Sequence, residues 1–192
     1  MDDRNLWRSR ASALVEATLT RPRIGHSREV ARLASELCDR FHGDEEKGYI
    51  GGMAHDLARE LDVAEILLLA ETDGQPVRDW EKDSPMLLHG RAAAAILLKH
   101  TGYSDPETLQ AIRDHVTGRG SMGMISKIVF AADFLEPTRE LVSPEFRRRT
   151  FALSLDEMVL AVLERKMHFV RQARQALSPD SLSLHEELAA HA

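Results

Sequence analysis

The sequence predicts an all-α protein. Apolar residues recur at steps of three and four through most of the chain, which is the period of a helix with one buried face. No segment shows sustained alternation of apolar and polar residues, the pattern of a half-buried strand. Capping residues, Gly and Pro divide the chain into segments of ordinary helical length. We therefore expect about eight to nine helices and no β-sheet.

The first part of the chain predicts four helices, each with its own boundary signal. Arg21-Pro22 ends the first, because proline cannot continue a helix. Gly43 ends the second, which carries the clearest apolar stripe. Asp62, with Glu65 three residues later, forms a capping box that starts the fourth. The four helices are expected over about residues 3–20, 24–43, 44–57 and 62–70.

Five more helices are expected beyond a polar stretch. Residues 71–85 contain five acidic residues with Gly and Pro, which predicts a surface loop of a length that often borders a site. The helices that follow are expected over about 87–102, 106–115 and 125–136, then from Ser143-Pro144, and finally from Ser154 to about 177. Ser178-Pro179-Asp180 is interpreted as a stop, with a loosely held tail from about residue 183.

Length, charge and cysteine content exclude several classes of function. The 192 residues suit one domain, and a hydrophobic content of 43% suffices for a core. No apolar run is long enough for a membrane span, and the charged start Met1-Asp2-Asp3-Arg4 does not resemble a secretory signal. We therefore expect a soluble, cytoplasmic protein without a membrane partner. A net charge of −6 argues against nucleic acid as a partner. The single cysteine, Cys38, is expected to be a core thiol.

The segment from Gly51 to Leu57 ends the third helix and holds the first candidate for chemistry. At 100° per residue, His55 shares a helix face with three glycines. Each glycine inside a helix costs about 0.5–1 kcal/mol relative to alanine, so another backbone is expected close to that face. A partly buried Asp56 needs a partner or a cation, and His55 beside it is a natural co-ligand.

Four of the nine histidines are expected to gather with two inward-facing carboxylates. All six lie at helix ends or on inward faces: His26, His55, Asp56, His89, His115 and Asp133. The other five histidines fall on polar faces or in the tail: His42, His100, His168, His185 and His191. Mixed imidazole and carboxylate ligation suits Fe, Mn, Co, Ni or Zn, whereas Mg prefers oxygen ligands. Each residue alone is equally well explained as a hydrogen-bonded helix end, so only the set indicates a metal site.

The order His26, His55-Asp56 and Asp133 on successive helices resembles the HD-domain superfamily of metal-dependent phosphohydrolases. The resemblance extends to the YqeK family, the HD-type symmetrical diadenosine tetraphosphate hydrolases. Its motifs span about residues 23–139, and residues 177–182 resemble that family's C-terminal segment. The matching segments are Arg23-x-x-His26-Ser27, His55-Asp56-Leu57-Ala58-Arg59-Glu60, Pro85-x-Leu87-Leu88-His89-Gly90, His115-x-Thr117-Gly118 and Lys127-Ile128-x-x-x-Ala132-Asp133-Phe134-Leu135-Glu136-Pro137-x-Arg139.

The resemblance implies a fold, a site and a reaction. The fold would be a single HD-domain helical bundle over residues 1–192. An iron-type metal, as one ion or two, would be held by His26, His55, Asp56 and Asp133, the two aspartates also being catalytic. The phosphates of a small-molecule nucleotide would be surrounded by Arg59, His89, His115 and Arg139. The reaction would be attack by metal-activated water, which splits diadenosine tetraphosphate into two ADP.

Two departures from the family pattern and several alternatives remain. Arg59 occupies a position where the family usually has lysine, and Val116 one where it usually has threonine. Lys127 and Arg119 have two interpretations: outer contacts to the phosphates, or ordinary solvated residues on the surface. The enzyme could instead act on a nucleoside monophosphate, a dNTP, a guanosine polyphosphate alarmone or a cyclic dinucleotide. A helical adaptor with a structural metal is the alternative without catalysis, and a homodimer is left open.

Overall fold

The computed structural model describes residues 3–190, and within that range every regular element is helical. This confirms the all-α prediction. In chain order the elements are α1 (Asp3–Thr18), α2 (Arg21–Arg40), α3 (Glu45–Ala54), α4 (Val63–Glu71), α5 (Asp79–Asp83), the 3₁₀ helix η1 (Pro85–Leu88), α6 (His89–Thr101), α7 (Pro106–Asp114), α8 (Met124–Leu135), α9 (Pro144–Thr150), α10 (Leu155–Gln172) and α11 (Pro179–Ala189).

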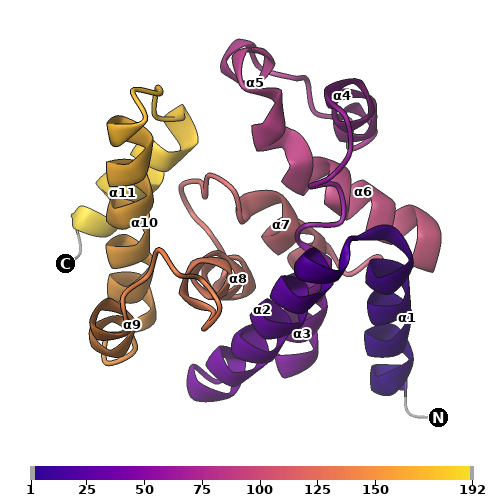
Figure 1. Cartoon of the computed structure of the whole chain (residues 1–192), viewed down its shortest axis with the longest axis horizontal. Helices are drawn as coiled ribbons and strands as arrows, with labels where there is room; N and C mark the ends of the chain where they lie inside the picture. Colours follow the sequence, from indigo (N-terminus) through magenta and orange to yellow (C-terminus); the bar gives the residue numbers. More distant parts are fainter. Residues whose placement is uncertain (1–2, 191–192) are drawn as a thin grey trace.

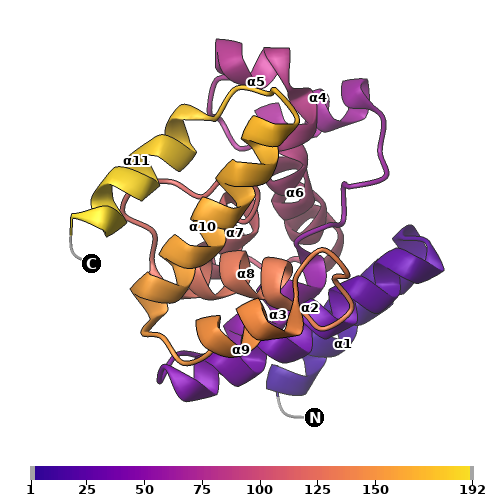
Figure 2. The same ribbon diagram turned by 60° about the vertical axis from the view of Figure 1, so that its left-hand side comes forward.

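The helices pack around two hydrophobic clusters that meet at α2. One cluster joins α2, α8, α10 and α11, and Phe130 of α8 is fully buried in it. The other joins α1, α3, α4, α6 and α7. Val30 belongs to the first cluster and the adjacent Ala31 to the second, so α2 is shared by both. Figure 1 shows α9, α10 and α11 on one side of α8 with α2, α3 and α1 on the other, and Figure 2 shows α10 crossing in front of α7 and α8.

The close approach of a backbone to the glycine face of α3 is confirmed. A Cβ atom on Gly52 would lie 2.8 Å from Ala31 Cα, and one on Gly48 would lie 2.9 Å from Ala34 O. Both contacts are with α2. Only glycine allows these two helices to come so near each other. Their close packing brings the C-terminal end of α3, and with it His55, against the N-terminal half of α2.

Two segments differ from the prediction, and they raise the number of α-helices in the described residues to eleven instead of the expected eight to nine. The expected loop 71–85 contains the short helix α5, whose N-terminal backbone at Arg78 donates to Glu81 at 2.8 Å. The expected loose tail is also wrong, because α10 ends at Gln172 and residues 179–189 form α11. Ser178 accepts from Ser181 N at 3.0 Å and therefore caps a new helix, with Pro179 in its first turn.

Helix α11 is held by burial as well as by its cap. Leu184 is fully buried and Leu188 is nearly so, both in the cluster that includes α8 and α10. Ser181 Oγ also donates to Thr117 O at 2.7 Å. The C-terminal segment is therefore an integral part of the core.

Two smaller expectations can also be compared with the structure. Cys38 is completely buried, and burial raises the pKa of its thiol to about 12, which confirms a core thiol. Among the described helices, none combines the length and the apolar composition that crossing a bilayer requires.

Candidate metal centre and the adjoining pocket

The structure brings together the four histidines and two aspartates that the sequence singled out. They are His26, His55, Asp56, His89, His115 and Asp133. Four of the six lie at or just beyond the end of a helix, and Asp133 lies in the last turn of α8. His26 lies in the second turn of α2 instead of the first, because that helix begins at Arg21. Helix ends from both halves of the chain therefore meet at one place.

Three of the imidazole rings are oriented in the same way. Nδ1 of His55, His89 and His115 lies 2.7, 2.6 and 2.8 Å from the carbonyl oxygen three residues earlier. A carbonyl oxygen only accepts hydrogen bonds, so each Nδ1 carries a proton and each neutral ring keeps a lone pair on Nε2. His26 follows the same rule with a carboxylate, since its Nδ1 donates to Glu136 at 3.2 Å. When all four rings are neutral, four lone pairs therefore face inward.

The inward-facing nitrogens form two close pairs with Asp56 between them. Nε2 atoms of His26 and His55 are 3.2 Å apart. Those of His89 and His115 are 3.0 Å apart. Asp56 Oδ2 lies 3.8 Å from His26 Nε2, while Oδ1 lies 3.3 Å from His89 Nε2. Lone pairs so close together, beside a carboxylate, require protons or cations between them.

These donors fit a divalent metal. Two groups of residues have ligand atoms close enough to share an ion: His26, His55 and Asp56 form one, and Asp56, His89 and His115 form the other. Asp56 belongs to both. Histidines whose Nδ1–H groups are already held by oxygen acceptors are typical of metal sites, because that hydrogen bond fixes the ring and raises its basicity. The donor set of the cluster thus fits a divalent metal ion.

Asp133 and Arg139 lie on one side of the cluster. Asp133 Oδ1 is 3.2 Å from His26 Nε2 and 3.5 Å from His55 Nε2. Arg139 forms an ion pair with the same oxygen and also donates from Nε to Asp133 O at 2.9 Å. The guanidinium of Arg139 therefore holds Asp133 in place as well as adding positive charge.

The sequence analysis assigned no role to two other residues that contact the cluster. Arg23 donates to Asp56 Oδ2 at 2.9 Å. Glu136 is almost fully buried and fixes the His26 ring, while Thr138 N donates to it at 2.6 Å. Spacing could have suggested Arg23, which precedes His26 by three residues on the same helix face. It could equally have suggested Glu136, three residues after Asp133.

Burial and neighbouring charges shift the pKa values of this cluster in opposite directions. Burial lowers the pKa of His26, but hydrogen bonds to Asp133 and Glu136 outweigh it and raise the value to about 9. Burial raises the pKa of Asp56, yet electrostatic interaction with His55 and with the other histidines beside it holds the value far below the usual range. Burial drives the pKa of His115 well below its ordinary value. Protons and metal ions compete for the same lone pairs.

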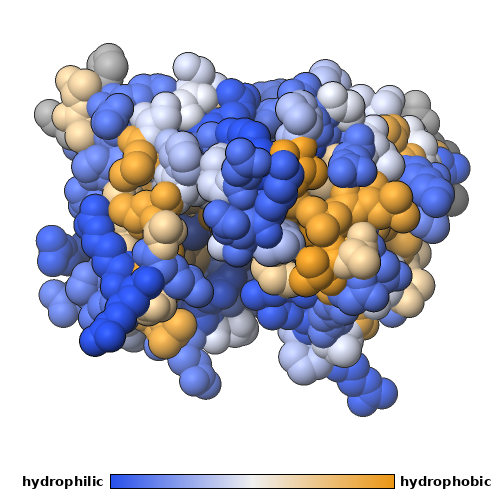
Figure 3. Space-filling model, turned by 90° about the horizontal axis from the view of Figure 1, so that it is seen from above, coloured by the Kyte–Doolittle hydropathy of each residue, from blue (hydrophilic) through white to orange (hydrophobic). Residues whose placement is uncertain are grey.

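A cavity of about 480 Å³ lies beside the segments that carry His89 and His115, and we call it the basic pocket. It is lined by Arg59, Lys166 and parts of segments 84–87, 116–117, 163–170 and 175–181, and no Asp or Glu lines it. A neighbouring cavity of about 460 Å³ contains four arginines balanced by four acidic residues. Seen from above in Figure 3, two hydrophobic patches are separated by hydrophilic surface. The basic pocket thus combines apolar walls with uncompensated positive charge.

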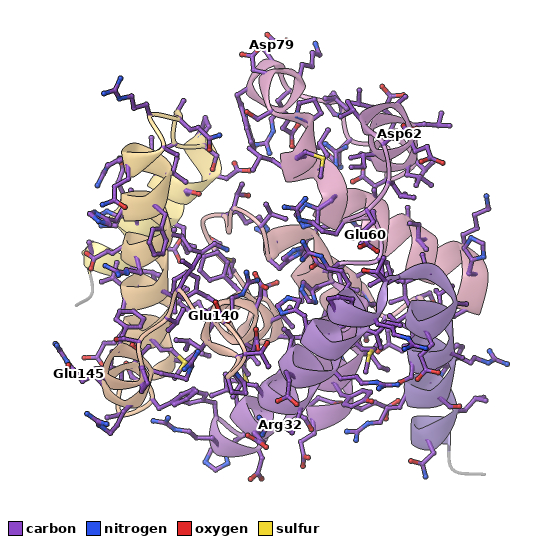
Figure 4. All side chains as sticks on the ribbon, in the orientation of Figure 1. Arg32, Glu60, Asp62, Asp79, Glu140 and Glu145 are labelled. Carbon is purple, nitrogen blue, oxygen red and sulfur yellow. The ribbon has the colours of Figure 1, made fainter. Side chains whose placement is uncertain are left out.

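The remaining candidates from the sequence fall in different places. Arg59 and Val116 line the basic pocket. Glu60, by contrast, accepts from Thr20 N at 2.9 Å at the start of α2, where Figure 4 labels it. Lys127 pairs with Asp156 at 2.6 Å. Lys127 thus lies outside the site, and Arg119 lines only the neighbouring cavity.

Five histidines were expected away from the cluster. His42, His100 and His168 are exposed. His185 lies on α11 within 3.5 Å of Glu164 rather than in a loose tail. His191 lies outside the described residues.

The fold and site agree with the comparisons with known proteins. The HD domain family matches residues 23–140, which include every residue of the cluster. The chain therefore belongs to the HD-domain family, and its relatives place it with the symmetrical bis(5'-nucleosyl)-tetraphosphatases.

Three relatives illustrate the similarity. The symmetrical bis(5'-nucleosyl)-tetraphosphatase of Halalkalibacterium halodurans is 30% identical over 183 residues, or 94% of this chain and 96% of that protein. The enzyme of the same name from Staphylococcus aureus is 31% identical over 171 residues, or 85% of this chain and 84% of the relative. A crystal structure of an HD superfamily hydrolase from Clostridium acetobutylicum, described as involved in NAD metabolism, matches with a TM-score of 0.90 and 27% identity, covering 96% of this chain and 97% of that one.

Proposed function

We propose that this protein is a metal-dependent phosphoric anhydride hydrolase that cleaves diadenosine tetraphosphate symmetrically into two ADP. One observation carries the proposal: a cluster of four histidines and two aspartates adjoins an acid-free pocket with two cations. The cluster suits a metal, and the pocket suits an anion with an apolar end, so together they suit a nucleotide. The names of the relatives support the particular substrate.

Four residues hold the metal in this proposal: His26, His55, Asp56 and Asp133. When bound, a transition metal supplies a Lewis acid and lowers the pKa of a bound water from about 15.7 to near 7. We favour iron, with Mn, Co, Ni or Zn as alternatives that the same ligand types accept. Asp56 and Asp133 also orient the attacking water through their carboxylate oxygens.

The surrounding cations bind and balance the phosphates. Arg59 has no ion pair within residues 3–190, and it contacts the phosphate chain from the basic pocket. His89 and His115 face either a phosphate or a second ion through Nε2. Arg139 contributes charge next to Asp133. Positive groups fixed in advance around a developing negative charge are usually the largest catalytic term in such sites.

The test is an assay of the purified protein with diadenosine tetraphosphate and each of the five metals, followed by anion-exchange separation. ADP as the sole product is expected from symmetrical cleavage, whereas ATP with AMP would show a different bond being attacked. The same assay with a nucleoside monophosphate, a dNTP, a guanosine polyphosphate and a cyclic dinucleotide compares the alternatives. Faster turnover of any of these would replace the proposed substrate, and no turnover at all would favour the adaptor.

The other expectations from the sequence stay predictions. They are action in the cytoplasm, a small-molecule partner without nucleic acid or membrane, and a homodimer as an open alternative. Size-exclusion chromatography with light scattering would settle the oligomeric state.

A further inference from the structure

The basic pocket contains a charged residue that the sequence did not single out. Lys166 lies on α10 in line with Leu163, Met167 and Val170, and all four line the pocket. Apolar residues at this spacing form an ordinary buried face of a helix, where lysine is rarely found. The ammonium turns inward and lies 4.1 Å from the centre of the Phe130 ring.

The Lys166 ammonium uses only part of its hydrogen-bonding capacity. Nζ donates to His115 O at 3.1 Å, its one hydrogen bond to the described residues. An ammonium has three donors, and no carboxylate between residues 3 and 190 pairs with this one. Lys166 is partly buried, and covering a charge is costly unless an opposite charge accompanies it. The structure therefore leaves hydrogen-bonding capacity and one positive charge for a ligand.

Arg59 faces the same cavity from a distant part of the sequence. It follows the end of α3, whereas Lys166 comes from α10, and neither has an acidic partner in the described chain. In the neighbouring cavity the cations are compensated, as where Arg78 pairs with Asp180 at 2.6 Å. Two cations without an ion-pair partner in one cavity of a chain with net charge −6 indicate a place for an anion.

We propose that Lys166 binds a phosphate of the nucleotide in the basic pocket, with Arg59 on the same phosphate chain. This inference rests on the proposed function and assigns one half of its substrate to a place. The nucleoside of that half lies against the apolar face formed by Leu163, Met167 and Val170. The bond from Lys166 to His115 O puts the ammonium beside the histidine cluster, so it contacts the phosphates close to the reacting centre.

The experiment measures ADP binding to the metal-loaded protein by titration calorimetry. Lys166→Met keeps the length and apolar stem of the side chain and removes the charge, so the Kd for ADP should rise roughly ten- to hundredfold. Lys166→Arg should remain within a fewfold of the unmodified protein. Lys127→Met is the matched control, because Lys127 is also a largely covered lysine but pairs with Asp156 and lines no pocket.

The outcomes separate a phosphate contact from a packing role. An unchanged Kd for ADP in Lys166→Met would overturn the proposal. If Lys166→Met loses metal or melts at a much lower temperature, Lys166→Arg decides: binding with arginine supports a cation contact, and binding lost with arginine overturns it. If the proposed function itself is wrong, the result is different: the unmodified protein releases no ADP from diadenosine tetraphosphate, regardless of how the Lys166 variants bind ADP.

Discussion

The histidine cluster and the basic pocket lie side by side and carry opposite chemistry. The cluster presents nitrogen lone pairs and carboxylates, all acceptors, and two groups of them share Asp56. The pocket presents two cations, apolar walls and no acid. Hydrogen bonds from Lys166 to His115 O and from His89 Nδ1 to Met86 O join the two regions. The difference supports the proposed roles, in which the cluster holds a metal ion and the pocket holds the phosphates on which that ion acts.

Substitutions should separate the two regions: changes in the cluster should remove metal, and changes in the pocket should weaken nucleotide binding with metal retained.

The largest effect is expected for Asp56→Ala, because Asp56 belongs to both potential metal groups. A metal supplies several kcal/mol of transition-state stabilisation, so kcat/KM should fall on the order of a thousandfold or more.

Elemental analysis and steady-state kinetics check this prediction. Asp79→Ala is the control, since its side chain is 97% exposed on α5, where Figure 4 labels it. Chelation of the unmodified protein should have the same effect as Asp56→Ala and should also lower Tm, because the ligands come from separate helices. Full activity of the metal-free protein would contradict the assignment of a metal to the cluster.

The second prediction concerns stability, because α11 forms part of the pocket wall. Leu184 is fully buried and packs on the loop after His115, so Leu184→Ala should cost about 2–5 kcal/mol. Tm should fall by roughly 2–4 °C per kcal/mol in a chain of this size. Leu182→Ala on the same helix is the matched control, since that side chain is 41% exposed. Equal melting temperatures for both variants would contradict the docking of α11.

The third prediction places Arg59 in the pocket and Arg139 at the cluster. Arg59→Ala removes a charge-assisted contact of about 1.5–3 kcal/mol, or roughly ten- to hundredfold in kcat/KM, with metal retained. Arg59→Lys should recover most of that loss. Arg139→Ala should also weaken the metal, because its guanidinium holds Asp133.

Metal content, kcat and KM should be measured for each variant, with the exposed Arg148→Ala as control. If the contact exists equally in ground and transition states, only KM rises. If it strengthens as the leaving diphosphate gains charge, kcat falls. Loss of metal from Arg59→Ala, together with retention of metal by Arg139→Ala, would contradict these two placements.

The smallest effect is expected at Val116, which lines the pocket beside His115. Val116→Thr adds a hydroxyl to a position facing the proposed phosphates, and one neutral hydrogen bond is worth about 0.5–1.5 kcal/mol. KM for diadenosine tetraphosphate should fall by a fewfold, with metal content and Tm unchanged. An unaltered or higher KM in kinetic assays would show that this side chain does not face the phosphates.

Local signals determined most of the helices. Caps such as Asp62 with Glu65 and stops such as Gly102 act within a few residues, so the sequence alone locates them. The same locality explains the error at the C-terminus. Ser178-Pro179 can follow one helix or start another, and only the burial of Leu184 favours the second.

The sequence by itself determined which six residues gather, because histidines and aspartates at helix ends, in a recognisable order, have few other reasons to be there. The tertiary structure alone decided what surrounds them. In the sequence Glu136 is only the residue that ends a helix. Its contact with His26, 110 residues earlier in the chain, exists only in the folded protein. Lys166 is indistinguishable in sequence from a solvated lysine until α10 packs on α8 and turns it towards Phe130. Contacts between distant helices depend on how their faces pack, and no local pattern records that.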